Sequence, residues 1–166
     1  MATAAEDGRL EYCERNMSRV RSDQAVFTIG YQGHTVASII SVLQAHQIDL
    51  LIDVRENPIS RKPGFSKKGL DKQLGCSGID YMHFPCLGTP LAIRRFYIES
   101  GRVEVALRRY ERYLQSKTAC LQSLVDIASD RRCCLLCLES CYTTCHRSVI
   151  AEKLARLTQW TPIHLT

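Results

Sequence analysis

Three of the five cysteines in the segment CCLLCLESCYTTCHRSVIAEKL, residues 133–154, lie close to a glutamate, a histidine and an arginine. An apolar run in this segment passes through a short polar turn into a helical pattern. The predicted strand ends near Cys137 and Glu139. The predicted helix begins with the residues CHR. Thiols, a carboxylate, an imidazole and a guanidinium can act as nucleophiles, acids, bases and anion ligands, so we expect chemistry at this junction.

Cys145 is a candidate nucleophile. If Thr143 or Thr144 caps the helix, Cys145 stands in the first turn, where the helix dipole favours a thiolate. Arg147 would then offer a planar fork for a phosphate or carboxylate. The alternative is a buried cysteine followed by a surface arginine.

Two other interpretations of the cysteines stay open. Cys141 and Arg147 have the C-x5-R spacing of cysteine phosphatases and some rhodanese-like domains. The loop between them has no glycine, which usually lets N–H groups converge on a phosphate. We predict no cofactor, and a zinc site is the second open interpretation of these cysteines. Structural zinc sites usually take their ligands from two separated segments of the chain, which this site would not. The ligands of that site would be Cys137, Cys141, Cys145 and His146.

Further polar residues follow two other apolar runs. Residues 26–29 and 50–54 are predicted to be buried strands, joined by an amphipathic helix that Thr35 caps. This βαβ unit has parallel strands, and ligands bind such sheets beyond the carboxyl ends of the strands. Residues 30–34 and 53–58 lie at those ends.

Several side chains at this edge have two interpretations each. Asp53 and Arg55 point to the same side of a strand, either as an ion pair that orders the following turn or as a catalytic or ligand-binding pair. Tyr31 and His83 should reach the same edge, where they could stack on a base or transfer protons. Packing on the sheet is the commoner outcome for such residues.

A basic cluster follows the second strand and comprises Arg55, Arg61, Lys62, Lys67 and Lys68. Lys67 and Lys68 open a helix that we expect to begin after Ser66, where positive charge is unfavourable. A nucleotide or a phosphate backbone would account for these lysines, and so would a solvated loop.

The remaining elements complete the predicted domain. Residues 79–84 form a third strand, residues 133–138 a central strand that is apolar on both faces, and residues 162–165 an edge strand. The last helix has a buried stripe of Ile150, Leu154 and Leu157. We assign to one salt-bridged helix the residues Arg94, Arg95, Arg102, Arg108, Arg109 and Arg112.

Length and composition indicate one α/β domain, residues 25–166, after a flexible arm, residues 1–24. We expect a mainly parallel sheet with helices on both faces, in rhodanese- or Rossmann-like layering. Nine cysteines in a chain of 166 residues fit reduced thiols and an intracellular protein, cytoplasmic or nuclear. The formal charge of +5 permits an anionic ligand, a nucleotide or nucleic acid. We expect no membrane partner.

Four motifs in order resemble the uncharacterised family DUF488: TIGYQGHT, LIDVRENPISRKPGFSKKGL, GIDYMHFPCLG and LLCLESCYTTCHRSVIAEKL. The resemblance covers about residues 26–157 and implies an α/β domain whose shared residues cluster at one end of a sheet. It implies no settled reaction, and Cys141 lies where family members vary. The family pattern falls on Gly30, Tyr31, Gly33, Asp53, Arg55, Pro58, Arg61, Phe65, Ser66, Tyr81, His83, Pro85, Leu87, Gly88, Cys137, Glu139, Cys145, His146 and Arg147.

We predict an enzyme, a hydrolase or a transferase, that acts on a phosphorylated, nucleotide or nucleic-acid substrate. The alternatives are a non-catalytic nucleic-acid-binding module that uses residues 55–72, and a phosphatase- or rhodanese-like enzyme that uses the C-x5-R loop. The candidate catalytic residues are Cys145, Glu139, His146, His83, Asp53 and Tyr31. The candidate ligand- or anion-binding residues are Arg55, Arg61, Arg147, Lys67, Gly30, Gly33, Gly88 and Cys137.

Overall fold

Five parallel strands form the sheet that positions the site, in the order β3-β2-β4-β1-β5. A computed structural model describes residues 25–166, and the predicted arm, residues 1–24, lies outside the described residues. The strands are β1 (Ala25–Gly30), β2 (Leu50–Asp53), β3 (Asp80–His83), β4 (Cys133–Cys137) and β5 (Thr161–Leu165). The predicted α/β class and parallel sheet are confirmed.

The central strand is β4, which pairs with β2 on one side and β1 on the other. Every residue of β4 is buried, as its continuous apolar sequence predicts for a strand covered on both faces. At the edge of the sheet, β5 pairs with β1 and contains Pro162, which an edge strand tolerates because one side needs no N–H donor.

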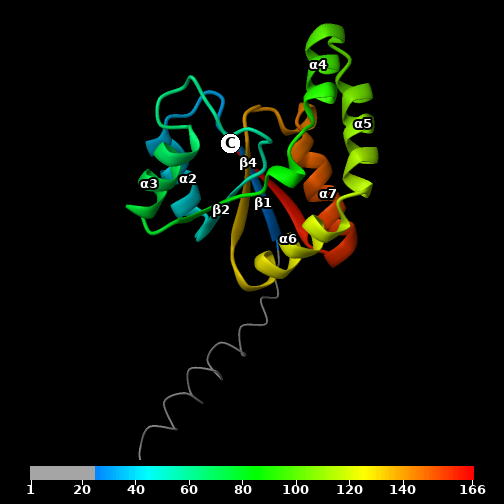
Figure 1. The fold of residues 1–166 in the computed structure, drawn as a ribbon. Helices are drawn as coiled ribbons and strands as arrows, with labels where there is room; N and C mark the ends of the chain where they lie inside the picture. The colour runs from blue at the N-terminus through cyan, green and yellow to red at the C-terminus, as the bar shows by residue number, and fades with distance from the viewer. Residues whose placement is uncertain (1–24) are drawn as a thin grey trace, which may run out of the picture.

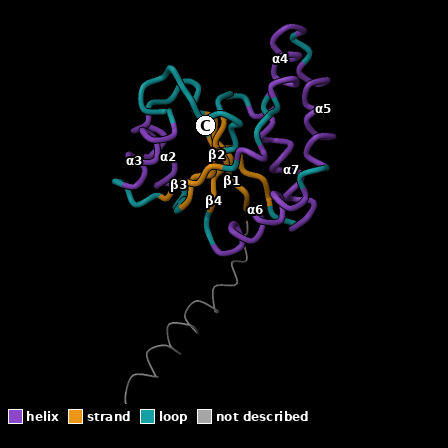
Figure 2. The backbone as a smooth tube through the Cα atoms, in the orientation of Figure 1, coloured by secondary structure: helices purple, strands orange, loops and turns teal. Residues whose placement is uncertain are grey.

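Helices cover both faces of the sheet (Figures 1 and 2). On one face, α2 (Val36–Ala45) and α3 (Lys67–Gly75) pack over side chains such as Ile29 and Leu136. On the other face, α5 (Val103–Gln115), α6 (Thr118–Asp130) and α7 (His146–Thr158) pack over the alternate side chains, such as Leu135. Successive side chains of a strand point to opposite faces of the sheet, so each strand contributes to both halves of the core.

The helix boundaries differ in how far local signals account for them. Thr35 caps α2 with a capping box, in which its side chain accepts from the Ser38 N–H. Ser66 occupies the N-cap position of α3, but its hydroxyl bonds to Ser60 instead of to the helix. The buried stripe of α7 ends at Leu154, because Leu157 in the last turn is 56% exposed.

The predicted arginine-rich helix is in fact two helices. Gly101 has a φ of 64°, and this left-handed residue ends α4 (Leu91–Ser100) before α5 begins. No residue of α4 is buried, and α4 packs on α5 at the upper right of the molecule in Figure 1. Arg94 and Arg95 therefore belong to a different element from Arg108.

The cysteines differ from the predicted uniform reduced state. Cys86, in the short 3-10 helix η1 (Pro85–Leu87), forms a disulfide with Cys120 of α6. These residues are 34 positions apart, and their approach depends on the packing of η1 against α6. The free cysteines of the described residues are Cys76, Cys133, Cys134, Cys137, Cys141 and Cys145.

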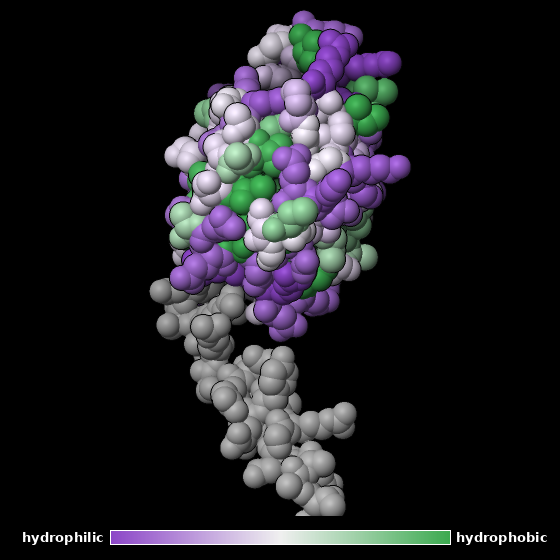
Figure 3. All heavy atoms as spheres, turned by 90° about the vertical axis from the view of Figure 1, so that its left-hand side faces the viewer, coloured by the Kyte–Doolittle hydropathy of each residue, from purple (hydrophilic) through white to green (hydrophobic). Residues whose placement is uncertain are grey.

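The surface on the side of α2 and α3 is mainly hydrophilic and surrounds an apolar area (Figure 3). None of the helices in residues 25–166 combines the length and the apolar character needed to cross a membrane.

Candidate functional site

A cavity of about 190 Å³ lies at the carboxyl edge of the sheet. Residues that follow β1, β2 and β4 form one side of it, and α4 and α5 form the other. The lining residues are Tyr31, Arg55, Glu56, Asn57, Ile59, Thr89, Ile93, Arg94, Tyr97, Ala106, Leu107, Tyr110, Cys137, Leu138, Glu139 and His146. The cavity thus lies at the edge of the sheet where parallel sheets usually bind ligands.

A thiol, a carboxylate and an imidazole meet in the lining of this cavity. The Cys137 Sγ is 3.2 Å from the Glu139 Oε2, to which the thiol donates, and 3.6 Å from the His146 Nδ1. Behind them, the Cys145 Sγ is 4.0 Å from the same ring nitrogen. We call Cys137, Glu139, Cys145 and His146 the thiol cluster.

The His146 ring has a defined orientation. Its Nε2 lies 3.0 Å from the Val54 carbonyl oxygen, and a carbonyl can only accept, so Nε2 carries the proton. In the neutral ring, Nδ1 is then an acceptor that faces both thiols. The Tyr110 ring packs edge-on against the imidazole, with 5.0 Å between ring centroids.

Burial and hydrogen bonding act in opposite directions on the thiol cluster. Burial raises the pKa of Cys145 well above its usual value, and Cys137 adds to the shift. Burial alone would raise the pKa of Glu139, but hydrogen bonds from Cys145 and Cys137 outweigh it and the pKa is lowered. Burial alone would lower the pKa of His146, but its contacts with Cys145 and Val54 raise it. These shifts favour the neutral thiol of Cys145, the charged carboxylate of Glu139 and proton binding by His146.

Asp53 and Arg55 form a buried ion pair below the cavity. The Arg55 Nε lies 2.8 Å from one Asp53 oxygen, and its Nη2 lies 2.5 Å from the other. Tyr81 donates to Asp53 over 2.7 Å, and the Arg55 Nη1 donates to the Tyr31 hydroxyl over 3.2 Å. Asp53 is completely buried and does not line the cavity, whereas Arg55 does.

The charges of this ion pair stabilise each other. Burial alone would lower the pKa of Arg55, but the hydrogen bond and charge of Asp53 outweigh it and raise the pKa. Burial, together with the Asp53 carboxylate, raises the pKa of Tyr81. Arg55 is therefore a permanent cation with its charge matched by Asp53.

Tyr31 and His83 reach the same edge in different ways. Tyr31 lines the cavity and stacks on Phe65, with 4.5 Å between ring centroids. The His83 Nε2 lies 2.9 Å from the Arg55 backbone oxygen, and its side chain is outside the cavity lining. Tyr31 thus faces the cavity, and His83 lies beside the loop that carries Arg55.

Arg147 is placed differently from the ligand-facing position that we expected. It is completely buried, and its guanidinium donates to the backbone carbonyls of Glu139 and Ser140 and to the Thr28 hydroxyl. The physical reason is that α7 packs on the sheet at this turn, so the side chain crosses under the loop after β4. Arg147 holds that loop instead of facing the cavity.

Cys145 is also displaced from its expected helical position. It is the N-cap residue of α7, with extended backbone (φ −117°, ψ 139°), and the first helical residue is His146. The cause is the 3-10 helix η2 (Tyr142–Thr144), where the Cys145 N–H donates to the Tyr142 carbonyl. Neither Thr143 nor Thr144 caps α7.

The C-x5-R loop does not have the geometry of a phosphate cradle. Cys141 is exposed, and its Sγ lies 3.0 Å from the Thr143 hydroxyl, which lowers the pKa of the thiol. The N–H groups of Thr144 and Cys145 donate within η2 instead of converging on the cysteine. The Arg147 guanidinium bonds backbone carbonyls instead, so the C-x5-R spacing of Cys141 and Arg147 does not by itself form a phosphate-binding site.

Two of the predicted glycines permit close backbone packing. A Cβ at Gly30 would overlap the Glu139 carbonyl, and a Cβ at Gly88 would overlap the Glu56 backbone. Gly33 has a φ of 88°, in a turn after β1 that favours glycine. These glycines therefore contribute to the cavity edge through backbone packing and backbone conformation.

The basic residues Arg61 and Lys67 are exposed and lie outside the cavity lining. Lys62 instead turns inward, where its Nζ donates to the Tyr31 carbonyl over 3.2 Å. Arg61 and Lys67 are therefore surface residues outside the cavity, whereas Arg55 of the same basic cluster is buried and lines it.

Sequence reasoning missed one side of the cavity. Ile93, Arg94 and Tyr97 come from α4, which has no buried stripe that periodicity would detect. Tyr110 of α5 lines the cavity as well; it is buried, and its hydroxyl donates to the Leu87 carbonyl over 2.5 Å. The role of the Val54 carbonyl as the partner of His146 could not be predicted, because a backbone carbonyl is present at every residue.

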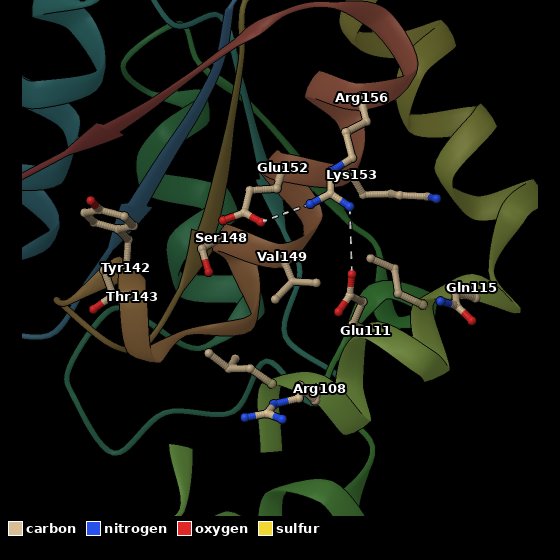
Figure 4. Close-up of a pocket in the computed structure, with 12 residues that line it drawn as sticks. Arg108, Glu111, Gln115, Tyr142, Thr143, Ser148, Val149, Glu152, Lys153 and Arg156 are labelled. Atoms are coloured by element: carbon tan, nitrogen blue, oxygen red, sulfur yellow. Dashed lines mark ion pairs between the residues drawn. The ribbon is translucent and has the colours of Figure 1, made fainter. Parts of the chain in front are cut away.

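A second cavity, of about 410 Å³, lies between α5, η2 and α7 (Figure 4). Arg156 crosses one side of it, with Glu111 and Glu152 each 4.0 Å away. Among the described residues that line it there is neither a cysteine nor a histidine. It therefore has less potential for chemistry than the smaller cavity.

The family model described as "Domain of unknown function DUF488" matches residues 35–154. This range includes the thiol cluster and the ion pair of Asp53 and Arg55. Comparison with curated proteins and with solved structures found no similar protein in either set.

Proposed function

Because the chain belongs to the DUF488 family, whose description assigns no reaction, we propose a function from the geometry of the site. The protein is an enzyme that acts on a small, mainly apolar and uncharged molecule in the cavity at the carboxyl edge. The observation that carries this proposal is the meeting of Cys137, Glu139 and His146 in the cavity lining.

The apolar lining supports a substrate with an apolar body. Ile59, Ile93, Leu107 and Leu138 line the cavity together with the ring of Tyr97. Ile59 and Leu138 are also exposed at its rim, at 74% and 44%. Small-molecule sites are usually apolar with a few convergent polar groups, and this cavity has that composition.

The pairing of the cations supports an uncharged substrate better than a phosphorylated one. The Arg55 guanidinium is engaged by Asp53, and the Arg94 guanidinium lies 3.6 Å from the Glu56 carboxylate. Glu139 adds a further negative charge. An anion in the cavity would meet this carboxylate without an unpaired cation among the described lining residues to offset it.

Glu139 is the general base in this proposal. Its carboxylate already accepts a hydrogen bond from the Cys137 thiol, and the His146 ring lies next to the same sulfur. A proton on a substrate in the cavity is within reach of the same carboxylate oxygen. The reaction class is therefore hydrolysis or group transfer with proton abstraction.

The test compares Glu139→Gln with the wild type on a panel of small uncharged esters, amides and aldehydes, with products detected by mass spectrometry. Loss of a general base lowers turnover by about 10²–10⁴-fold. Glu152→Gln, in the second cavity, is the matched control and should keep full activity. Ala106→Leu, which fills the cavity from α5, should raise KM or abolish binding. Equal turnover by Glu139→Gln and the wild type would contradict the proposal.

A second candidate is nucleic-acid binding by the exposed basic loop. Lys67 and Lys68 occupy the first turn of α3, which has no acidic residue there, and Arg61 is exposed nearby. An oligonucleotide would offset this unfavourable charge. Fluorescence anisotropy should then show affinity that falls steeply with salt, and that Lys67→Ala weakens but Glu139→Gln does not.

A further inference from the structure

We propose that the thiol cluster binds one divalent metal ion of the zinc type. The protein ligands are Cys137, Cys145 and His146, whose ligand atoms all lie within 4.8 Å of one another. This inference deepens the proposed function by assigning an ion to the same site, and metal binding itself can be measured without a substrate.

The spacing of the ligand atoms fits a tetrahedral ion. With Zn–S about 2.3 Å and Zn–N about 2.0–2.1 Å, a sulfur and a nitrogen ligand lie about 3.6 Å apart, and two sulfurs about 3.8 Å apart. The Cys137 and Cys145 sulfurs lie 3.6 and 4.0 Å from the His146 Nδ1. Small side-chain shifts would therefore bring all three atoms to bonding distance.

The imidazole is already arranged as a ligand. Metal-bound histidines usually donate their other ring N–H to a carboxylate or backbone carbonyl, which fixes the tautomer. The Val54 carbonyl provides this contact at the Nε2 of His146. The unprotonated Nδ1 points at the position between the two sulfurs.

The fourth position faces the cavity. Cys137 and His146 line the cavity, whereas Cys145 is 1% exposed and lies behind them. Glu139 is close enough to contact a water molecule at the fourth position, because its Oε2 is 3.2 Å from the Cys137 sulfur. Three protein ligands and one open position are typical of catalytic zinc sites.

The binding step involves no oxidation or reduction. Each thiol loses its S–H proton to solvent as its sulfur bonds the ion, so two protons are released for each ion bound. Thiolate and imidazole ligands select zinc-type ions over magnesium and calcium, which prefer oxygen.

Cys141 is excluded from the ligand set by its position. It is exposed, and its sulfur contacts Thr143 instead of the thiol cluster. The zinc site considered from the sequence thus has three of its four residues together. Cys141→Ser is consequently a matched control for Cys137→Ser and Cys145→Ser.

The experiment uses the full chain, purified under reducing conditions, loaded with zinc chloride and desalted. Elemental analysis should give one zinc per chain for the wild type and Cys141→Ser, and much less for Cys137→Ser and Cys145→Ser. Competition with a chromophoric chelator should show that Cys137→Ser and Cys145→Ser each lower the zinc affinity by more than about 100-fold. Loss of a residue that only hydrogen-bonds to a metal ligand typically lowers the affinity by about 10–100-fold. Cobalt substitution of the wild type should give the absorption of a tetrahedral cobalt–thiolate site.

Failure of this inference and failure of the proposed function are distinguishable. A wild-type protein that retains no zinc and shows no cobalt–thiolate absorption overturns the metal site, whatever its activity; this readout depends on no variant. Zinc retained equally by Cys141→Ser and Cys145→Ser, with circular dichroism showing both folded, also overturns it. Stoichiometric zinc with turnover unaffected by Glu139→Gln would support the metal site and contradict the proposed function.

Discussion

The His146 Nε2 donates to the Val54 carbonyl over 3.0 Å, across 92 positions of the sequence. This hydrogen bond joins the end of β2 to the first turn of α7. It turns the other ring nitrogen toward Cys137 and Cys145, and thereby defines the chemistry of the site.

The buried ion pair gives the first prediction. Asp53→Asn leaves the Arg55 guanidinium without a counter-charge and should lower the free energy of unfolding by about 3–5 kcal/mol. Urea denaturation measures the loss. The exposed pair of Arg108 and Glu104, 3.4 Å apart, is the control, and Glu104→Gln should cost less than about 1 kcal/mol. Similar losses for the two variants would contradict the burial argument.

Arg147 should act on stability. Arg147→Lys replaces a guanidinium that bonds Glu139, Ser140 and Thr28 with an ammonium that cannot reach all three. Because each hydrogen bond to a charged group contributes about 1.5–3 kcal/mol, we expect a loss of about 2–4 kcal/mol in unfolding free energy. The exposed Arg156→Lys should be near neutral. An Arg147→Lys protein as stable as the wild type would contradict this stabilising role.

Gly30 should not tolerate a side chain. Gly30→Ala places a methyl group against the Glu139 carbonyl and the Arg147 guanidinium, so the loop after β4 must move. We expect unfolding at a temperature several degrees lower, since about 1 kcal/mol shifts Tm by roughly 2–4 °C at this size. Gly75→Ala, where an added Cβ would meet no atom within 4 Å outside its chain neighbours and the backbone of its own helix, should leave Tm unchanged or raise it. Equal Tm values for both variants would contradict the close packing.

The stability should depend on pH through His164. Burial, with a further contribution from the Arg147 charge, lowers the pKa of His164 below its usual 6.5; the ring also bonds Thr28 and stacks on Tyr142. The unfolded state therefore binds the proton first, and stability falls as the pH drops below about 6.5 until the folded state is also protonated. Urea denaturation between about pH 7 and 5 should show a steeper decline for the wild type than for His164→Asn. Parallel declines would rule this out.

Much of the fold was predictable because its signals are local. The apolar run of β4 and the capping residue Thr35 appear directly in the sequence, and both predictions are confirmed. Cys137, Glu139 and His146 were expected together because a single strand–turn–helix segment carries them. Their closeness needed only the correct assignment of two neighbouring elements.

The parallel sheet and the residue types at its carboxyl edge follow from local sequence patterns, because periodicities of two and of 3.6 residues are visible along the chain. Which of these groups face the cavity depends on packing between distant segments. One residue of difference in the start of α7 made Cys145 the N-cap, and packing of α7 on the sheet buried Arg147. The cavity side from α4 and the Val54 carbonyl also depended on contacts between distant segments, which no local pattern specifies.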